Sequence, residues 1–174
     1  MRSNRSLKNE TTRILGIDPG IALLGYGVID CTRGVSTCVT YGCLTTPKTL
    51  PLPERLYALS VGIRQLITDH KPTVVGVETI RFAKNETTGI AVAEARGVVL
   101  AAIAEARLPI IELTPLEVKQ SLTSYGHADK KQVQYMVKQI LKLKETPKPD
   151  DAADALAVAL ATEQLYRFQT KTKR

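Results

Sequence analysis

The sequence predicts an α/β protein in which one mixed sheet of about five strands is flanked by helices. Two observations lead to this fold class. Three segments rich in β-forming residues follow one another between residues 13 and 44, and helical and strand patterns alternate from there to the end of the chain. A length of 174 residues suits a single domain with a buried core.

The first three strands are expected to form an antiparallel meander. The run RILGID, residues 13–18, is apolar and stops at a Pro-Gly turn, as a buried strand does. Residues 24–31 and 35–44 are also rich in β-formers, and a short Arg-Gly turn separates them. Each of these strands should therefore pair with the next.

The middle of the chain predicts a helix followed by a buried strand. Apolar residues recur at helical spacing over residues 56–67, and Pro72 ends that helix. The apolar run VVGV at residues 74–77 is short enough for a buried strand and closes at Glu78. An acidic residue thus stands at the end of this strand.

The remaining sequence predicts four helices and one strand. Residues 88–106 are Ala-rich and helical, and residues 110–113 form a short strand. The sequence TPLE at 114–117 is a capping box with Pro at the first helical position, so a helix begins there. Residues 129–143 place apolar side chains on one face, and residues 150–168 form a last, Ala-rich helix. This order of elements resembles that of ribonuclease-H-like folds.

The formal charge of +7 comes from the two ends of the chain, so basicity alone does not indicate a nucleic-acid partner. Residues 1–13 carry a net +3 and residues 164–174 a net +4, whereas the body balances 16 basic against 16 acidic side chains. We expect a disordered basic extension at 1–12, a folded domain at 13–168 and a basic tail at 169–174.

Composition excludes several classes of protein. The apolar runs are much shorter than the roughly 18 residues of a membrane span, and no apolar segment follows the charged N-terminus as it would in a secretory signal. The three cysteines lack metal-ligand spacing and lie in predicted strands, so buried thiols are expected. These features favour a cytoplasmic protein without a membrane partner.

Four acidic side chains are predicted to converge at one edge of the sheet. Asp18 and Glu78 each end a strand, and ligands gather at the carboxyl ends of parallel strands in open α/β sheets. Asp151 and Asp154 share one face of the last helix, whose Ala residues would let it pack close to the sheet. Spacing alone does not choose between Asp150 and Asp151, since either shares a face with Asp154.

Most of these acids also have a purely structural explanation. Asp18 suits an Asx turn, Glu78 could pair with a nearby cation, and Asp150 and Asp151 suit the cap and first turn of a helix. Asp154 fits none of these, because it lies beyond the first turn among apolar neighbours, where an unpaired acid is costly. Acting together, four carboxylates would balance two Mg²⁺ ions, which prefer oxygen ligands and in pairs suit phosphoryl transfer.

At these residues the sequence resembles the RuvC family of Holliday-junction resolvases, the crossover junction endodeoxyribonucleases. The matching blocks are ILGIDPGIALLGYG (14–27), EARGVV (94–99), EVKQ (117–120), ADKKQVQYMV (128–137) and DAADALA (151–157). The resemblance implies a ribonuclease-H-like homodimer that nicks four-way DNA junctions with Mg²⁺, for which Mn²⁺ substitutes. It also implies the RuvA and RuvB branch-migration complex as a partner.

The resemblance assigns roles residue by residue. Asp18, Glu78, Asp151 and Asp154 match the catalytic, metal-binding acids, and the DAAD pattern selects Asp151 over Asp150. Lys119 and Lys130 are implied DNA contacts. They lie in a Lys-rich stretch, residues 116–148, that carries a net charge of +4. The alternative for these two lysines is a solvated helix face.

One position departs from the family pattern. Members often carry an aromatic residue three positions after the Glu that matches Glu78, where it is thought to wedge against junction bases. Here that position is Arg81, and Phe82 follows it. Either side chain has a plane that stacks on a base. The alternative is that Phe82 packs within its loop while Arg81 contacts phosphate.

The predicted function is that of a homodimeric, structure-selective endonuclease that resolves Holliday junctions in homologous recombination and DNA repair. Two identical sites on a closed dimer would make paired symmetric nicks by two-metal hydrolysis. One alternative is another ribonuclease-H-like nuclease that acts on RNA-containing duplexes or structured RNA, which would not be expected to share the DAADALA and ADKKQVQ blocks. Another is a catalytically silent junction-binding module, which predicts a broken acid set.

Overall fold

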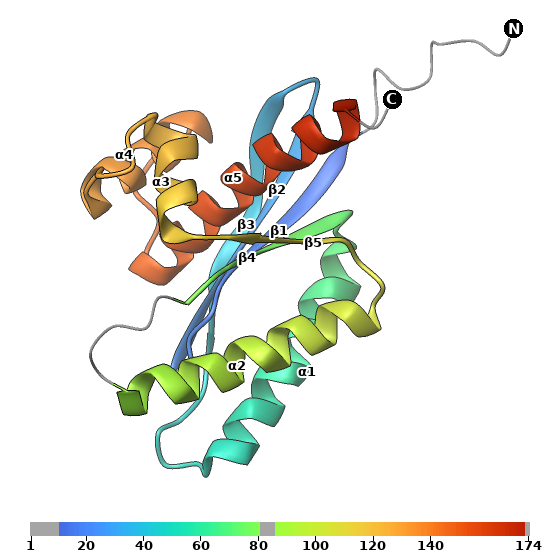
Figure 1. Ribbon diagram of the computed structural model, residues 1–174, viewed down its shortest axis with the longest axis vertical. Helices are drawn as coiled ribbons and strands as arrows, with labels where there is room; N and C mark the ends of the chain where they lie inside the picture. Colours follow the sequence, from blue (N-terminus) through green and yellow to red (C-terminus); the bar gives the residue numbers. More distant parts are fainter. Residues whose placement is uncertain (1–10, 81–85, 173–174) are drawn as a thin grey trace, which may run out of the picture.

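The computed structural model describes residues 11–80 and 86–172, which fold into a five-stranded sheet with helices on both faces (Figure 1). The predicted mixed sheet flanked by helices is confirmed. The strands are β1 (Thr12–Asp18), β2 (Leu23–Thr32), β3 (Val35–Thr45), β4 (Val74–Glu78) and β5 (Ile110–Leu113). The helices are α1 (Leu52–His70), α2 (Glu86–Glu105), α3 (Pro115–Thr123), α4 (Lys130–Ile140) and α5 (Asp150–Thr172).

The strand order is β3-β2-β1-β4-β5. The first three strands form the antiparallel meander expected from the sequence, and β4 and β5 extend the sheet in parallel with β1. Ile17 of β1 pairs with Val77 of β4. The residues that follow, Asp18 and Glu78, therefore end two neighbouring parallel strands at the same edge of the sheet.

The core has one layer on each face of the sheet. Helices α1 and α2 cover one face, while α5 covers the other, with α3 and α4 packed against it (Figure 1). Leu15 and Ile17 point into the layer shared with α1 and α2. Ile14 points the other way, into the layer shared with α3, α4 and α5. Helix α5 lies between the sheet and two helices. Its residues from Ala152 to Ala161 are therefore apolar and buried, with the exception of the half-buried Asp154.

Helix α5 lies directly on the sheet because the strands present glycines to it. Side chains alternate along a strand, so Gly16 and Asp18 of β1 share the face toward α5, as Gly76 and Glu78 of β4 do. A Cβ at Gly16 would overlap the backbone of Ala155. The glycines therefore leave room for α5 to pack directly on the strands. Asp18 and Glu78 lie on the same face of the sheet as these glycines, at the edge where β1 and β4 end.

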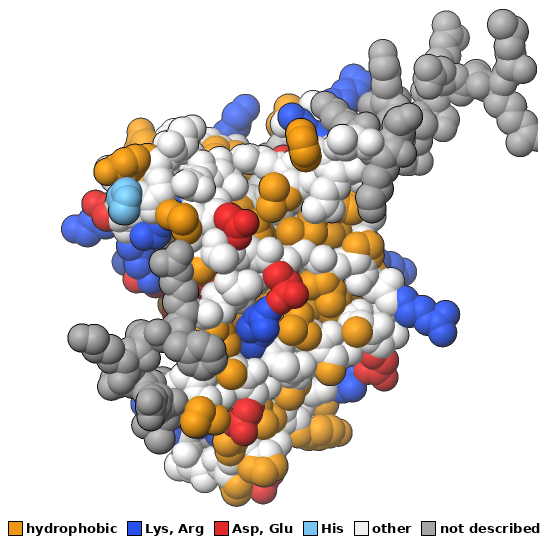
Figure 2. All heavy atoms as spheres, in the orientation of Figure 1, with side chains coloured by type: hydrophobic (Ala, Val, Ile, Leu, Met, Phe, Trp, Pro, Cys, Tyr) orange, Lys and Arg blue, Asp and Glu red, His pale blue; other side chains and the backbone are white. Residues whose placement is uncertain are grey.

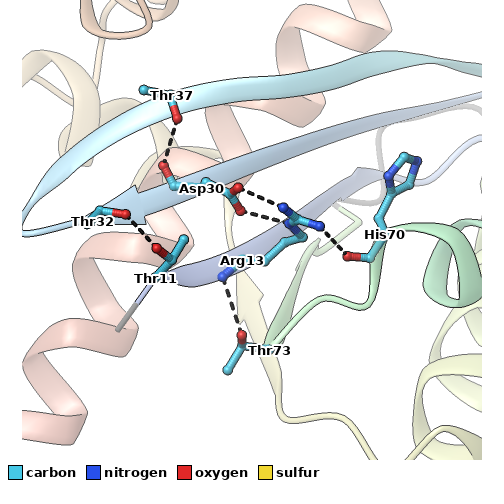
Figure 3. Close-up of polar contacts among 7 residues, drawn as sticks. All are labelled: Thr11, Arg13, Asp30, Thr32, Thr37, His70 and Thr73. Atoms are coloured by element: carbon cyan, nitrogen blue, oxygen red, sulfur yellow. Dashed lines mark hydrogen bonds and ion pairs between the residues drawn. The ribbon is translucent and has the colours of Figure 1, made fainter. Parts of the chain in front are cut away.

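A polar cluster closes the opposite end of β1 (Figure 3). Arg13 donates from Nε and Nη2 to the two carboxylate oxygens of Asp30 on β2, at 2.8 and 2.7 Å. Its Nη1 donates to the carbonyl of His70 at the end of α1, at 3.0 Å. The backbone N–H of Arg13 donates to Thr73 Oγ1 just before β4. This guanidinium thus connects β1, β2 and the C-terminus of α1.

The helix ends differ from the predicted ones for local reasons. Helix α1 begins at Leu52, directly after Pro51, and α5 continues to Thr172 because no Gly or Pro interrupts it. Residues 169–172 of the predicted basic tail are therefore helical, while residues 1–10 and 173–174 lie outside the described part.

Cys31 is buried as predicted, but Cys38 and Cys43 are only half-buried, and all three are free thiols. Among the described residues, no helix is long and apolar enough to cross a bilayer.

Candidate active site

The four predicted acids come from three elements that meet at one edge of the sheet. Asp18 and Glu78 end β1 and β4, and Asp151 and Asp154 lie in the first two turns of α5. Gly25 of β2, which pairs with Asp18, faces the backbone of Asp151, and a Cβ there would overlap the Asp151 carbonyl. The start of α5 therefore lies against the strand beside Asp18.

Burial and mutual repulsion favour the protonated forms of the two strand acids. Desolvation, followed by the charges of Glu78, Asp154 and Asp151, raises the pKa of Asp18 to about 8. Desolvation and the charge of Asp154 raise the pKa of Glu78 to about 7, although a hydrogen bond from Asp18 acts in the opposite direction. The edge thus holds more negative charge than its surroundings compensate, which is the electrostatic condition of a cation site.

Lys130 compensates part of this charge. Its Nζ lies 2.9 Å from Asp154 Oδ2 and 3.3 Å from Asp150 Oδ2. Burial raises the pKa of Asp154, and the hydrogen bond from Lys130 offsets part of that rise. Partial burial disfavours the ammonium, but the hydrogen bonds to Asp154 and Asp150 outweigh it and raise the pKa of Lys130. The first residue of α4 is therefore an ion-pair partner of the acid cluster, while its side chain stays 51% exposed.

Asp150 lies outside the acid cluster. Its carboxylate accepts a hydrogen bond from Gln134 Nε2 at 3.1 Å and faces Lys130, and these two contacts of α4 lower its pKa. The side chain is largely exposed. Asp150 thus links α4 to the start of α5 and its charge acts on Asp154, whereas the charge of Asp151 acts on both Asp18 and Asp154.

A cavity of about 220 Å³ lies beside the cluster, and we call it the acid pocket. Its lining includes the carboxylates of Glu78 and Asp154 together with Lys119 of α3 and Lys130 of α4. The charge of Lys119 also acts on Glu78 and lowers its pKa in part. Both lysines singled out in the sequence therefore line the same pocket as two of the acids.

The donor set of this edge suits a hard divalent cation. Asp18, Glu78, Asp151 and Asp154 offer oxygen atoms only, and burial followed by mutual repulsion raises the pKa values of the two strand acids, whose ionised forms a cation would stabilise. Within the described ranges, no three acidic, thiol or imidazole side chains already stand together as ligands of one ion. Lys130 Nζ instead lies against Asp154, and a side-chain hydrogen bond joins Asp18 and Glu78.

Sequence reasoning missed one neighbour of the acids. Cys43 of β3 pairs with Gly25, and burial, followed by the charges of Asp151 and Asp18, raises the pKa of its thiol to about 11. Only the register of β2 and β3 reveals this proximity, because nothing in the local sequence distinguishes Cys43 from the other cysteines. The predicted stacking residues Arg81 and Phe82 lie outside the described residues.

A mixed five-stranded sheet of this order with helices on both faces is a ribonuclease-H-like fold, and the carboxylates and lysines lie at the carboxyl edge of its parallel strands. Residues 14–162 match the family model described as crossover junction endodeoxyribonuclease RuvC. The chain belongs to the RuvC family, whose members are metal-dependent nucleases.

Known relatives match over most of their length. The crossover junction endodeoxyribonuclease RuvC of Syntrophomonas wolfei is 48% identical over 158 residues, which cover 91% of this chain and 92% of that protein. The enzyme of the same name from Desulforamulus reducens is 50% identical over 87% of this chain and 93% of its own. Among solved structures, T. thermophilus RuvC in complex with Holliday junction substrate has a TM-score of 0.86 at 35% identity, covering 91% of this chain and 97% of that one.

Proposed function

We propose that this chain is a structure-selective endonuclease that resolves Holliday junctions in homologous recombination and DNA repair. The observation that carries the proposal is the cluster of four acids at the edge where β1, β4 and α5 meet. It occurs in a chain that matches the RuvC family model from residue 14 to residue 162. Hydrolysis of a phosphodiester at this cluster would leave a nick in one strand of the junction.

The acids are proposed to hold two Mg²⁺ ions, for which Mn²⁺ would substitute. Divalent cations in such a site lower the pKa of water and stabilise the negative charge that develops on a phosphate under attack. Asp18 and Glu78 would supply ligands from the strand ends, and Asp151 and Asp154 would supply them from α5. The role of α5 is to present its two acids at a fixed distance from the strand acids.

The lysines of the acid pocket are proposed to hold the DNA backbone. Lys119 and Lys130 stand on the side of the pocket formed by α3 and α4, where they would neutralise phosphates on either side of the scissile bond. Arg81 or Phe82 is proposed to stack on junction bases in place of the usual aromatic wedge. Residues 13–168 would then form the nuclease domain, with residues 1–12 and 169–174 as basic extensions.

Resolution also requires two sites. A four-way junction has approximate two-fold symmetry, so a homodimer with closed two-fold symmetry presents two identical acid clusters to opposite strands. A single site would nick once and leave the arms joined. We expect the dimer to act together with the RuvA and RuvB branch-migration complex.

Cleavage of defined DNA substrates tests the proposed function. Purified protein is incubated with a synthetic mobile four-way junction, a replication fork and a linear duplex, each with Mg²⁺ or with EDTA. We expect paired nicks of like polarity in the junction alone, and only with Mg²⁺. Equal cleavage of all three substrates, or activity that survives EDTA, would overturn the proposal.

Single substitutions test the acids, with an adjacent acid as the matched control. Asp18→Asn and Asp154→Asn should lower cutting at least about 100-fold while the Kd for the junction changes by less than about threefold. Asp150→Asn should cut within about threefold of wild type, because that carboxylate is exposed and faces α4. Loss of junction binding by Asp18→Asn would instead assign this residue a structural role.

A further inference from the structure

A second and larger cavity adjoins the acid pocket. It has a volume of about 690 Å³ and lies between α3 and the segment that leads into α4. Pro115 and Lys119 line both cavities. Lys119 therefore lies where the second cavity and the acid pocket adjoin.

Two aromatic rings line the second cavity, which we call the aromatic pocket. Tyr125 and His127 have ring centroids 5.6 Å apart and planes tilted by 59°. Tyr125 is 60% exposed, so most of its ring is available to a ligand. Rings with an open face beside a cation are the features with which proteins hold single-stranded nucleic acid, because every base has a face that stacks.

The segment that carries the rings is held in place by short-range contacts. Ser124 ends α3 in the left-handed conformation, with φ of 56°. Thr123 Oγ1 donates to the Tyr125 carbonyl at 2.8 Å and accepts from the Tyr125 N–H at 3.2 Å. Gly126 packs so closely on α3 that a Cβ would overlap Leu116. The backbone that carries the rings is therefore positioned before any ligand arrives, which lowers the entropic cost of stacking.

We propose that the aromatic pocket binds one nucleotide of the DNA strand that enters the acid pocket, with its base stacked on Tyr125 and His127 and its phosphate at Lys119. The inference rests on the proposed function, since it places this nucleotide next to the scissile phosphate. Lys and Arg side chains gather over the corner formed by α3 and α4, where a phosphate backbone would lie (Figure 2). A base that has left its pair at the junction centre exposes the face that this pocket requires.

A neighbouring cavity provides the control. It has a volume of about 570 Å³ and is lined by Tyr125 and by Tyr135, which is also 60% exposed but does not line the aromatic pocket. In the described part of the chain, none of its lining residues also lines the acid pocket. Tyr135 therefore matches Tyr125 in residue type and exposure. It does not line the aromatic pocket, which is the cavity that adjoins the acid pocket.

Junction affinity tests the stacking role. Tyr125→Ala should raise the Kd for the four-way junction by about 5-fold to 100-fold, the range of one lost base stack, whereas Tyr125→Phe stays within about twofold. Tyr135→Ala should also stay within about twofold. At saturating enzyme, the single-turnover cutting rate of Tyr125→Ala should fall by a smaller factor than its junction affinity, because the acids are untouched. An unchanged Kd in Tyr125→Ala, or equal losses in Tyr125→Ala and Tyr135→Ala, would overturn the inference.

Photochemical cross-linking locates the nucleotide. The cleavage site of a junction is mapped first, and 5-iodouracil is then placed at each of the two positions on either side of the scissile phosphate. After irradiation in EDTA, we expect a cross-link to Tyr125 or His127 from one of these positions, and cross-links to other residues only would overturn the inference. If wild-type protein neither binds nor cuts the junction, the proposed function fails and the inference fails with it. If wild type cuts without this cross-link, the stacking inference alone fails.

Discussion

The ammonium of Lys130 lies 2.9 Å from Asp154 Oδ2, so the first residue of α4 forms an ion pair with an acid in the second turn of α5. The same ammonium reaches Asp150 at 3.3 Å. The ammonium of Lys130 on α4 thus contacts two carboxylates of α5 at the acid cluster. This contact gives the cluster a positive partner from the protein itself, and its effect on Asp154 can be measured directly.

Removing the Lys130 charge should raise the pKa of Asp154. The hydrogen bond and charge of Lys130 favour the ionised carboxylate of Asp154. In Lys130→Met, burial and the neighbouring acids therefore raise the pKa of Asp154 without this opposing effect. Carboxyl-carbon NMR titration of metal-free protein measures this pKa. Lys131→Met is the matched control, because the neighbouring lysine does not contribute to the shift of Asp154. An Asp154 pKa that stays constant in Lys130→Met would contradict the ion pair in solution.

The metal-free protein should lose stability as the pH rises from about 5 to about 8.5. Asp18 and Glu78 have folded-state pKa values of about 8 and about 7, above their ordinary values, so the folded state binds more protons than the unfolded state between these limits. The free energy of unfolding then falls with increasing pH. Urea unfolding in EDTA at a fixed protein concentration measures the trend, and Asp18→Asn should flatten it. A rise in stability over this range would contradict the assigned burial of the acids.

Divalent cations should reverse that loss. A cation that binds the folded acids stabilises the folded state by mass action, about 2.7 kcal/mol at a concentration 100 times its Kd. Protons compete for the same carboxylates, so the increase in Tm on adding Mg²⁺ should be larger at pH 8.5 than at pH 6. Thermal unfolding with Mg²⁺ or EDTA measures the difference. Asp154→Asn should lose most of the Mg²⁺-induced increase in Tm, whereas the control Asp69→Asn, on α1, should keep it. If Asp154→Asn keeps the full increase in Tm, Asp154 is not part of the cation site.

Adding a methyl group at Gly25 should impair cutting through the position of α5. The new Cβ would overlap the Asp151 carbonyl, so the first turn of the helix must shift away from the strand acids. A displacement of about 1 Å in a catalytic group can lower a rate about 100-fold. Gly62→Ala is the control, because its Cβ meets the flexible Leu44 side chain at 2.7 Å, in the core layer on the face of the sheet opposite to α5. Equal single-turnover rates for the two variants would show that α5 tolerates the added methyl group.

The Arg13 cluster should contribute to stability and not to cutting. Arg13→Met removes two hydrogen bonds to Asp30 and one to the His70 carbonyl. Because the Arg13 side chain is 36% exposed, we expect a loss of about 1 kcal/mol in the free energy of unfolding. Arg64→Met removes the more exposed pair with Glu105 and should cost less. Urea unfolding and junction cleavage are measured for both variants, and a slower cleavage in Arg13→Met would show that the two ends of β1 are coupled.

Local sequence determined the elements and marked the candidate acids, whereas the choice of Asp151 over Asp150 came from the resemblance to the RuvC family. The capping box at Thr114, the Pro-Gly turn after Asp18 and the alternation of apolar runs are short-range signals, and each acts through residues a few positions apart. The DAAD spacing placed Asp151 and Asp154 near one another because three residues span almost one helical turn. These features could be predicted from the sequence since the backbone geometry of a helix or strand is the same in every protein.

Only the tertiary structure decided which side chains surround the acids. The Lys130–Asp154 ion pair, the approach of Cys43 to Asp151 and the exclusion of Asp150 depend on how α4, β3 and α5 pack. The raised pKa values of Asp18 and Glu78 depend on burial as much as on charge. Such relationships join residues far apart in the chain. The Ala residues of the last helix predicted its close packing on the sheet, but the register that brings its acids beside Gly25 and Cys43 depends on tertiary packing.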